Sequence, residues 1–128
     1  MNLESLTEEV NKYVPVWRLR QAAEAATNYV MNYTEAEIKV REATNEDPWG
    51  PEGPILNEIA RMTSMYSYFG EIMGMLWSRM CQDNEGAWRR VYKGLLVLDF
   101  LIKNGSDRCV VNAKEHVYDL RTLQNFYE

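Results

Sequence analysis

The sequence has few of the residues from which catalytic and metal centres are built. Two cysteines, Cys81 and Cys109, stand far apart without a C-x-x-C motif, and His116 is the only histidine among 128 residues. Neither a zinc site nor a disulfide framework fits this set. We therefore expect no metal and no cofactor, and we expect both thiols to be buried or without a role and His116 to be structural or on the surface.

Nucleotide-binding loops and nucleophile–base pairs are also missing from the sequence. It contains no G-x-x-x-x-G-K and no G-x-G-x-x-G, and no serine or cysteine stands in a recognisable motif with a base. Glu35 and Glu37 could be read as an acid–base pair, but a helix-capping role explains Glu37 with fewer assumptions. We predict that the protein is not an enzyme.

Long apolar runs are absent as well, and so is a basic start. No stretch approaches the ~20 apolar residues of a membrane span, and residues 1–15 are polar and acidic, unlike a signal peptide. We expect a cytoplasmic protein whose residues 1–15 form a flexible N-terminal extension and whose residues 16–128 form one helical domain.

The balance of charge argues against nucleic acid as a partner. The net charge is −5, whereas duplex binding requires many phosphates to be neutralised. Residues 1–58 hold five Lys or Arg against eleven Asp or Glu, while residues 88–128 hold seven against five. Any anion-binding face must therefore draw on the second half of the chain.

Apolar residues recur at intervals of three and four along nearly the whole chain, which predicts an all-α fold with short connections. Thr34 and Glu37 form a capping box, so a helix should begin at Glu35. Asn104-Gly105 should end a central, enclosed helix as a C-cap glycine does. The other helices are predicted over 16–31, from 55 to a break near Ser67, over 69–80, from 88 to 104, and as a single last helix capped by Ser106.

One segment interrupts the helices with three prolines, two glycines and a tryptophan. Asp47 precedes Pro48 and is therefore pushed out of the α region, so Asp47-Pro48-Trp49-Gly50 should form a fixed turn. A turn does not need a tryptophan. We predict that the Trp49 ring packs into the core and pins the turn, the alternative being an exposed contact for a partner or a membrane.

Basic residues gather where one predicted helix ends and the next begins. Arg79 lies at the end of one helix, and Arg89, Arg90 and Lys93 lie in the first turns of the next. Residues 89 and 93 are one turn apart and share a face, near a helix N-terminus that favours anions. A solvated helix face remains the alternative to an anion site.

The sequence resembles the ENTH (epsin N-terminal homology) domain family of clathrin-associated adaptors. The resemblance rests on "NYTEAEIKVREATNEDPWGP", "EIMGMLWSRM", "WRRVYKGLLVLDFLIKNGSDR" and "EHVYDLRTL", and it covers about Trp17 to Tyr127. W-S-R-M, W-R-R and E-H-x-Y-D-L-R look closer to the epsin-related (enthoprotin-type) branch than to epsin. The resemblance implies a right-handed superhelical solenoid of short helices, ENTH/VHS-like, with the C-terminal helices of the family absent.

The resemblance also implies a site for phosphoinositide headgroups on a membrane surface. Matched position by position, the headgroup ligands would be Arg41, Arg79, Arg90, which takes the place of a histidine in epsin, and Lys93. Further basic contacts would come from Arg18, Arg20 and Arg89.

Several positions depart from the epsin pattern, and the departures predict weak lipid binding with little membrane bending. The leading helix has Ala23, Glu24 and Thr27 where epsin has basic residues, Glu46 replaces an asparagine ligand, and the basic loop residue falls at Glu85 or Gly86.

The partners implied by the resemblance are a phosphoinositide-containing membrane, clathrin and adaptor complexes reached through a tail beyond these residues, and a SNARE cargo. A monomer is expected, acting at the trans-Golgi network, endosomes and clathrin-coated vesicles. The alternative function is a cargo adaptor that recognises the N-terminal helical domain of a SNARE and binds little or no lipid.

Overall fold

The structure, a computed structural model, describes residues 15–124, and every regular element in that range is an α-helix. The all-α prediction is confirmed. Most of the predicted extension at residues 1–15 lies outside the described residues. The chain divides into two compact units, Met1–Tyr33 and Thr34–Glu128, and each unit is described by itself.

The first unit contributes one described helix, α2, Val16–Met31, with the bounds that the sequence predicts. It ends at Asn32, which adopts the left-handed conformation with φ 53°, a position that asparagine tolerates better than most residues. The apolar stripe of α2 is shallow, as expected from its alanines, and Tyr29 and Val30 are exposed.

The second unit begins with the predicted capping box. The backbone N–H of Glu37 donates to Thr34 Oγ1 at 3.2 Å, and the N–H of Thr34 donates to Glu37 Oε1 at 3.0 Å. Helix α3, Glu35–Ala43, starts there and buries Ala36 and Val40. This boundary was predictable because the residues that set it are three positions apart.

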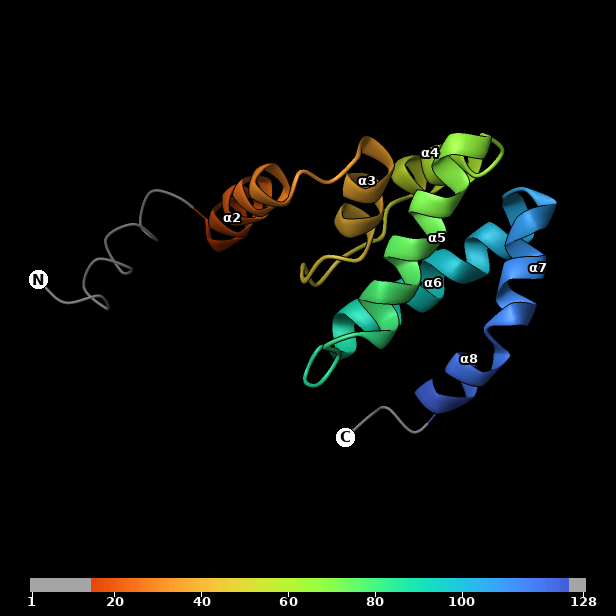
Figure 1. The fold of residues 1–128 in the computed structure, drawn as a ribbon. Coiled ribbons are helices and arrows are strands. Elements are labelled where there is room, and N and C mark those ends of the chain that lie inside the picture. Colours follow the sequence, from red (N-terminus) through yellow and green to blue (C-terminus); the bar gives the residue numbers. More distant parts are fainter. Residues whose placement is uncertain (1–14, 125–128) are drawn as a thin grey trace, which may run out of the picture. The chain divides into compact units, whose positions relative to one another are not determined.

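The remaining helices are α4, Gly53–Met62; α5, Tyr66–Cys81; α6, Trp88–Asn104; α7, Asp107–Glu115; and α8, Val117–Leu123. Within this unit α5 packs against α3 and α6, and α6 packs against α7, so that α5 and α6 cross at its centre (Figure 1). The core is formed by fully buried side chains from α3 to α7, of which the apolar ones with the largest volume are Ile59, Ile72, Leu76, Met80, Leu101, Val40, Val97 and Cys109.

Two predicted helix boundaries are wrong. The break after α4 falls at residues 63–65 rather than near Ser67, and Tyr66 begins α5 with its ring exposed. The predicted last helix is two helices, α7 and α8, which meet at His116. Apolar spacing continues across both breaks, so periodicity alone did not reveal them.

The environment of α6 also differs from the prediction. Leu95, Leu96 and Ile102 are 37–39% exposed, so the helix is central but not enclosed. Gly105 does end it, yet with φ −87° rather than a left-handed conformation. A Cβ at residue 105 would lie 2.7 Å from the Leu101 carbonyl oxygen, so glycine is required here by close packing.

The start of α7 is fixed by a side chain from another helix end. Ser106 occupies the N-cap position, as predicted, but makes no side-chain capping bond. Instead its backbone N–H donates to Thr63 Oγ1 at 3.0 Å. Thr63 itself is fully buried at the end of α4, so this hydrogen bond ties the beginning of α7 to the end of α4.

Candidate functional site

The candidate site is built around the turn that follows α3. Asn45 Nδ2 donates to Asp47 Oδ2 at 3.1 Å, and the backbone N–H of Asp47 donates to Asn45 Oδ1 at 3.2 Å, an arrangement in which asparagine imitates a backbone turn. Thr44 and Asp47 are buried. We call residues 44–47 the carbonyl turn, because their backbone oxygens accept hydrogen bonds from cationic side chains.

Lys93, from α6, lies beneath this turn and is only 3% exposed. Its Nζ donates to the Asn45 carbonyl at 3.0 Å, to Asn45 Oδ1 at 2.6 Å and to the Asp47 carbonyl at 2.9 Å. A buried ammonium is tolerated when oxygen atoms replace its water. The carbonyl turn supplies those oxygens.

Two arginines hold the same turn from other directions. Arg79, from α5, donates from Nε to Thr44 Oγ1 at 3.0 Å and from a terminal nitrogen to the Thr44 carbonyl at 2.9 Å. Arg89, from α6, donates to the Glu46 carbonyl at 3.0 Å and lies over the Trp88 ring at 4.8 Å. Carbonyls after a helix carry partial negative charge, which cations stabilise.

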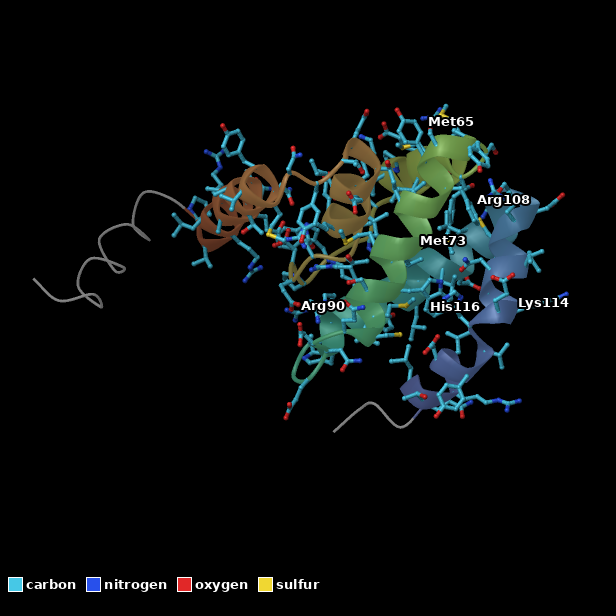
Figure 2. The ribbon with its side chains drawn as sticks, in the orientation of Figure 1. Met65, Met73, Arg90, Arg108, Lys114 and His116 are labelled. Atoms are coloured by element: carbon cyan, nitrogen blue, oxygen red, sulfur yellow. The ribbon has the colours of Figure 1, made fainter. Side chains whose placement is uncertain are left out.

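Arg90 likewise donates hydrogen bonds to backbone carbonyls, but at the end of α5. It donates from Nε to the Arg79 carbonyl at 2.8 Å, and from a terminal nitrogen to the carbonyls of Gln82 and Asp83 at 3.1 and 2.6 Å. Figure 2 shows Arg90 at that end of the molecule. We call Arg79, Arg89, Arg90 and Lys93 the cation cluster.

The structure therefore brings together the residues that the sequence singled out near the α5–α6 connection. As predicted, Arg89 and Lys93 share a face of α6, since both reach the carbonyl turn. Arg41 lies in the last turn of α3, one helical turn before Thr44. Its backbone is therefore close to the carbonyl turn. Arg18 and Arg20 belong to the first unit, and their distance from the cluster is not defined.

Sequence reasoning missed what the cluster binds within the protein. A basic pattern near a helix N-terminus predicts an anion site, but the partners found are mostly backbone carbonyls, and those of Lys93 lie 46 and 48 residues earlier in the chain. Among the departures from epsin, Glu46 is half-buried in the carbonyl turn and Glu85 is exposed. Their negative charges weaken the field of the cluster.

The Trp49 ring is not in the core, contrary to the prediction, since it is 49% exposed. Residues 46–49 do form a bend, and Gly50 directly after it has φ 82°, a conformation suited to glycine. The turn is instead pinned by Lys93, whose Cε lies 4.0 Å from where a Cβ on Gly50 would be. Lys93, rather than the Trp49 ring, therefore holds this segment in place.

A second cluster, of two rings and an amide, joins α5 to α7. The Trp77 and His116 rings are stacked with centroids 4.2 Å apart. Trp77 Nε1 donates to Asn112 Oδ1 at 2.7 Å, and His116 Nδ1 lies 2.8 Å from the Asn112 carbonyl. We call Trp77, Asn112 and His116 the ring stack; it gives His116 the structural role that was predicted.

The cysteines show no reactive environment. Cys109 is fully buried and Cys81 half-buried, and both are free thiols. Burial, with a smaller contribution from Asp119, raises the pKa of the Cys81 thiol above its ordinary value, so the unreactive protonated form dominates at neutral pH. Within residues 15–124 no group of three or more acidic, histidine or cysteine side chains could hold a metal.

No helix in the described range is both long and apolar enough to cross a membrane. Anion recognition at a surface is the chemistry that the cation cluster can support.

Comparison with known proteins identifies the family of this chain. The family model of the ENTH domain matches residues 33–128. The chain is 59% identical over 112 residues to human Clathrin interactor 1, covering 88% of this chain and 18% of that protein, and 50% identical over 99 residues to human Epsin-3, covering 77% and 16%. It thus spans less than a fifth of the length of these relatives.

Solved structures point the same way. The human epsinR ENTH domain superimposes with a TM-score of 0.74 at 60% identity, covering 75% of this chain and 71% of that one. The epsin-2 ENTH domain in complex with phosphatidylinositol 4,5-bisphosphate gives 0.73 at 36% identity, covering 80% and 72%. The higher identity to epsinR and Clathrin interactor 1 confirms the expected likeness to the epsin-related branch, and the chain belongs to the ENTH domain family.

Proposed function

We propose that this chain is a non-enzymatic adaptor module that binds phosphoinositide headgroups and acts in clathrin-coated vesicle formation at the trans-Golgi network and endosomes. The observation that carries the proposal is the convergence of Arg79, Arg89 and Lys93 on the carbonyl turn, with Arg90 at the adjoining end of α5 and Arg41 in the last turn of α3. The relatives support it, since one is named for clathrin and an epsin-2 ENTH domain was solved with phosphatidylinositol 4,5-bisphosphate.

The binding proposed is weak. Each Lys or Arg near an anionic leaflet contributes about 1 kcal/mol, so four contribute roughly 4 kcal/mol, a dissociation constant of about 1 mM. Hydrogen bonds between guanidinium and phosphate are needed for more. Because several donors of the cluster already bind carbonyls and Glu46 lies among them, we expect a monomer that associates peripherally and bends membranes little.

Vesicle sedimentation tests the proposal. Vesicles of phosphatidylcholine with phosphatidylinositol 4-phosphate or 4,5-bisphosphate should sediment more protein than phosphatidylcholine alone. Arg41→Glu combined with Arg90→Glu should abolish the difference. Arg61→Glu combined with Arg121→Glu, exposed residues of α4 and α8, is the matched control and should reduce it much less. Equal sedimentation by all vesicles would refute headgroup binding.

A different observation favours a second function, recognition of the N-terminal helical domain of a SNARE. Met65 and Tyr66 are 51% and 87% exposed. Arg108 of α7 lies over the Tyr66 and Phe69 rings at 5.5 and 4.2 Å, and Figure 2 shows Met65 and Arg108 at the same end of the second unit. Exposed apolar side chains beside a cation suit a folded protein partner.

Pull-down with a purified SNARE helical domain tests this alternative. Met65→Ser combined with Tyr66→Ser should remove capture, while the Arg41→Glu, Arg90→Glu protein should still capture. Absence of capture by the wild-type chain would count against the cargo role and leave the lipid role untouched.

A further inference from the structure

Lys93 differs from Arg89 and Arg90 in having no donor left for a ligand. An ammonium has three N–H groups, and three oxygens of Asn45 and Asp47 accept hydrogen bonds from its Nζ at 2.6–3.0 Å. The side chain is almost wholly covered. A phosphate could reach Nζ only by displacing one of these oxygens, which would break a part-buried or buried hydrogen bond to a charged group and so cost free energy.

Arg89 and Arg90 are differently placed. Both are partly exposed, and a guanidinium has five N–H donors. Arg89 makes one hydrogen bond within the described residues and Arg90 makes three. Each arginine can therefore hold a carbonyl and contact an anion at once, which Lys93 cannot do.

The carbonyl turn connects Lys93 to Arg89. Lys93 binds the residues on either side of Glu46, and Arg89 donates to the Glu46 carbonyl between them. Fixing Asn45 and Asp47 therefore fixes the oxygen that orients the Arg89 guanidinium. This path needs no contact between Lys93 and a ligand.

We infer that Lys93 is a positioning residue of the headgroup site: it holds the carbonyl turn, and through Glu46 it orients Arg89, which contacts the phosphate. The inference rests on the proposed phosphoinositide binding. Lys93 then contributes to the affinity for the headgroup without contacting its phosphates.

The test uses an uncharged residue that completes the same arrangement. Asn45→Ala removes one acceptor of Lys93 and the hydrogen bonds that shape the turn, with no change of charge. Vesicles of phosphatidylcholine with phosphatidylinositol 4,5-bisphosphate are titrated at several NaCl concentrations with the wild type, Asn45→Ala, Lys93→Met and the double variant. Lys114→Met, an exposed lysine of α7, controls for the loss of one charge. Circular dichroism confirms that each variant is folded.

If Lys93 positions the turn, Asn45→Ala weakens binding about fivefold or more, comparable to the loss of one or two hydrogen bonds to a charged group. The double variant is no weaker than the weaker single variant, because both act through one turn. The salt dependence of Lys93→Met matches that of the wild type.

A lysine that contacts phosphate gives a different result, since its removal lowers the slope of log K against log[NaCl] by about one. That change in slope, together with wild-type binding by Asn45→Ala, overturns the inference and leaves the proposed function standing. Absence of binding by the wild-type chain overturns the proposed function and this inference with it.

Discussion

The cation cluster and the ring stack both join α5 to another helix, but they do so with different chemistry. The cation cluster uses charged donors on backbone carbonyls, whereas the ring stack uses a neutral indole, an amide and an imidazole. Both satisfy polar groups that would otherwise be buried without partners. The cation cluster alone adds positive charge, so one kind of helix contact can serve anion binding and the other can serve stability only.

The largest effect that separates the two regions should come from Arg79→Met. It removes two donors from Thr44, which is fully buried, and we expect the free energy of unfolding to fall by about 2 kcal/mol. Because the carbonyl turn loosens, vesicle binding should fall too. Urea denaturation and sedimentation measure both quantities. Arg121→Met, an exposed arginine of α8, should change stability by less than about 0.5 kcal/mol.

Trp77→Phe tests the other side of the comparison. It keeps a ring against His116 but loses the hydrogen bond to Asn112, so unfolding should become easier by about 1.5 kcal/mol. Vesicle binding measured below the unfolding transition should not change. A loss of lipid binding with the fold intact would show that the two regions are coupled, and the distinction between them would fail.

A smaller effect is expected from Trp49→Ala. A buried tryptophan costs about 3–5 kcal/mol when truncated to alanine, but this ring is half exposed, and Lys93 holds the turn instead. We therefore expect a loss of about 1 kcal/mol or less in urea denaturation. A loss of 3 kcal/mol or more, on the scale of a fully buried ring, would restore the original prediction that Trp49 anchors the turn.

The smallest effect concerns Cys81, at the end of α5. Since burial and Asp119 raise the pKa of its thiol, alkylation at pH 7 should be slower than in a model peptide and should accelerate as the pH rises. Asp119→Asn removes the smaller cause and should speed the reaction slightly. Mass spectrometry separates this site from Cys109, which is fully buried.

Local signals predicted α2 and α3 well. The Thr34–Glu37 box lies within one helical turn, so the sequence contains all of it, and the recurrence of apolar residues at intervals of three and four predicted the order of the later helices. The α7–α8 break at His116 was missed because the apolar spacing runs through it. At this break the His116 ring stacks on Trp77 of α5. That contact is with a residue distant in the sequence, so no local pattern contains it.

The grouping of the basic residues was predicted from the sequence, but their contacts within the protein were not. The residue types and spacing of Arg89, Arg90 and Lys93 indicated a cationic face, and the structure brings them together. That Lys93 would be buried depends on the fold of residues 45–47, far away in the sequence. A lysine on a helix is normally expected to be exposed. Lys93 can be buried because the carbonyl turn supplies the oxygen atoms that accept its hydrogen bonds.

Two arginines link the end of one helix to a helix that comes later in the chain. Arg79 of α5 holds the end of α3, and Arg90 of α6 holds the end of α5. The ends of α3 and α5 thus each depend on a later helix for partners of their carbonyls, so neither end is complete before the later helix has docked. Amide hydrogens in α3, α5 and α6 should therefore exchange with similar opening free energies, as one cooperative unit.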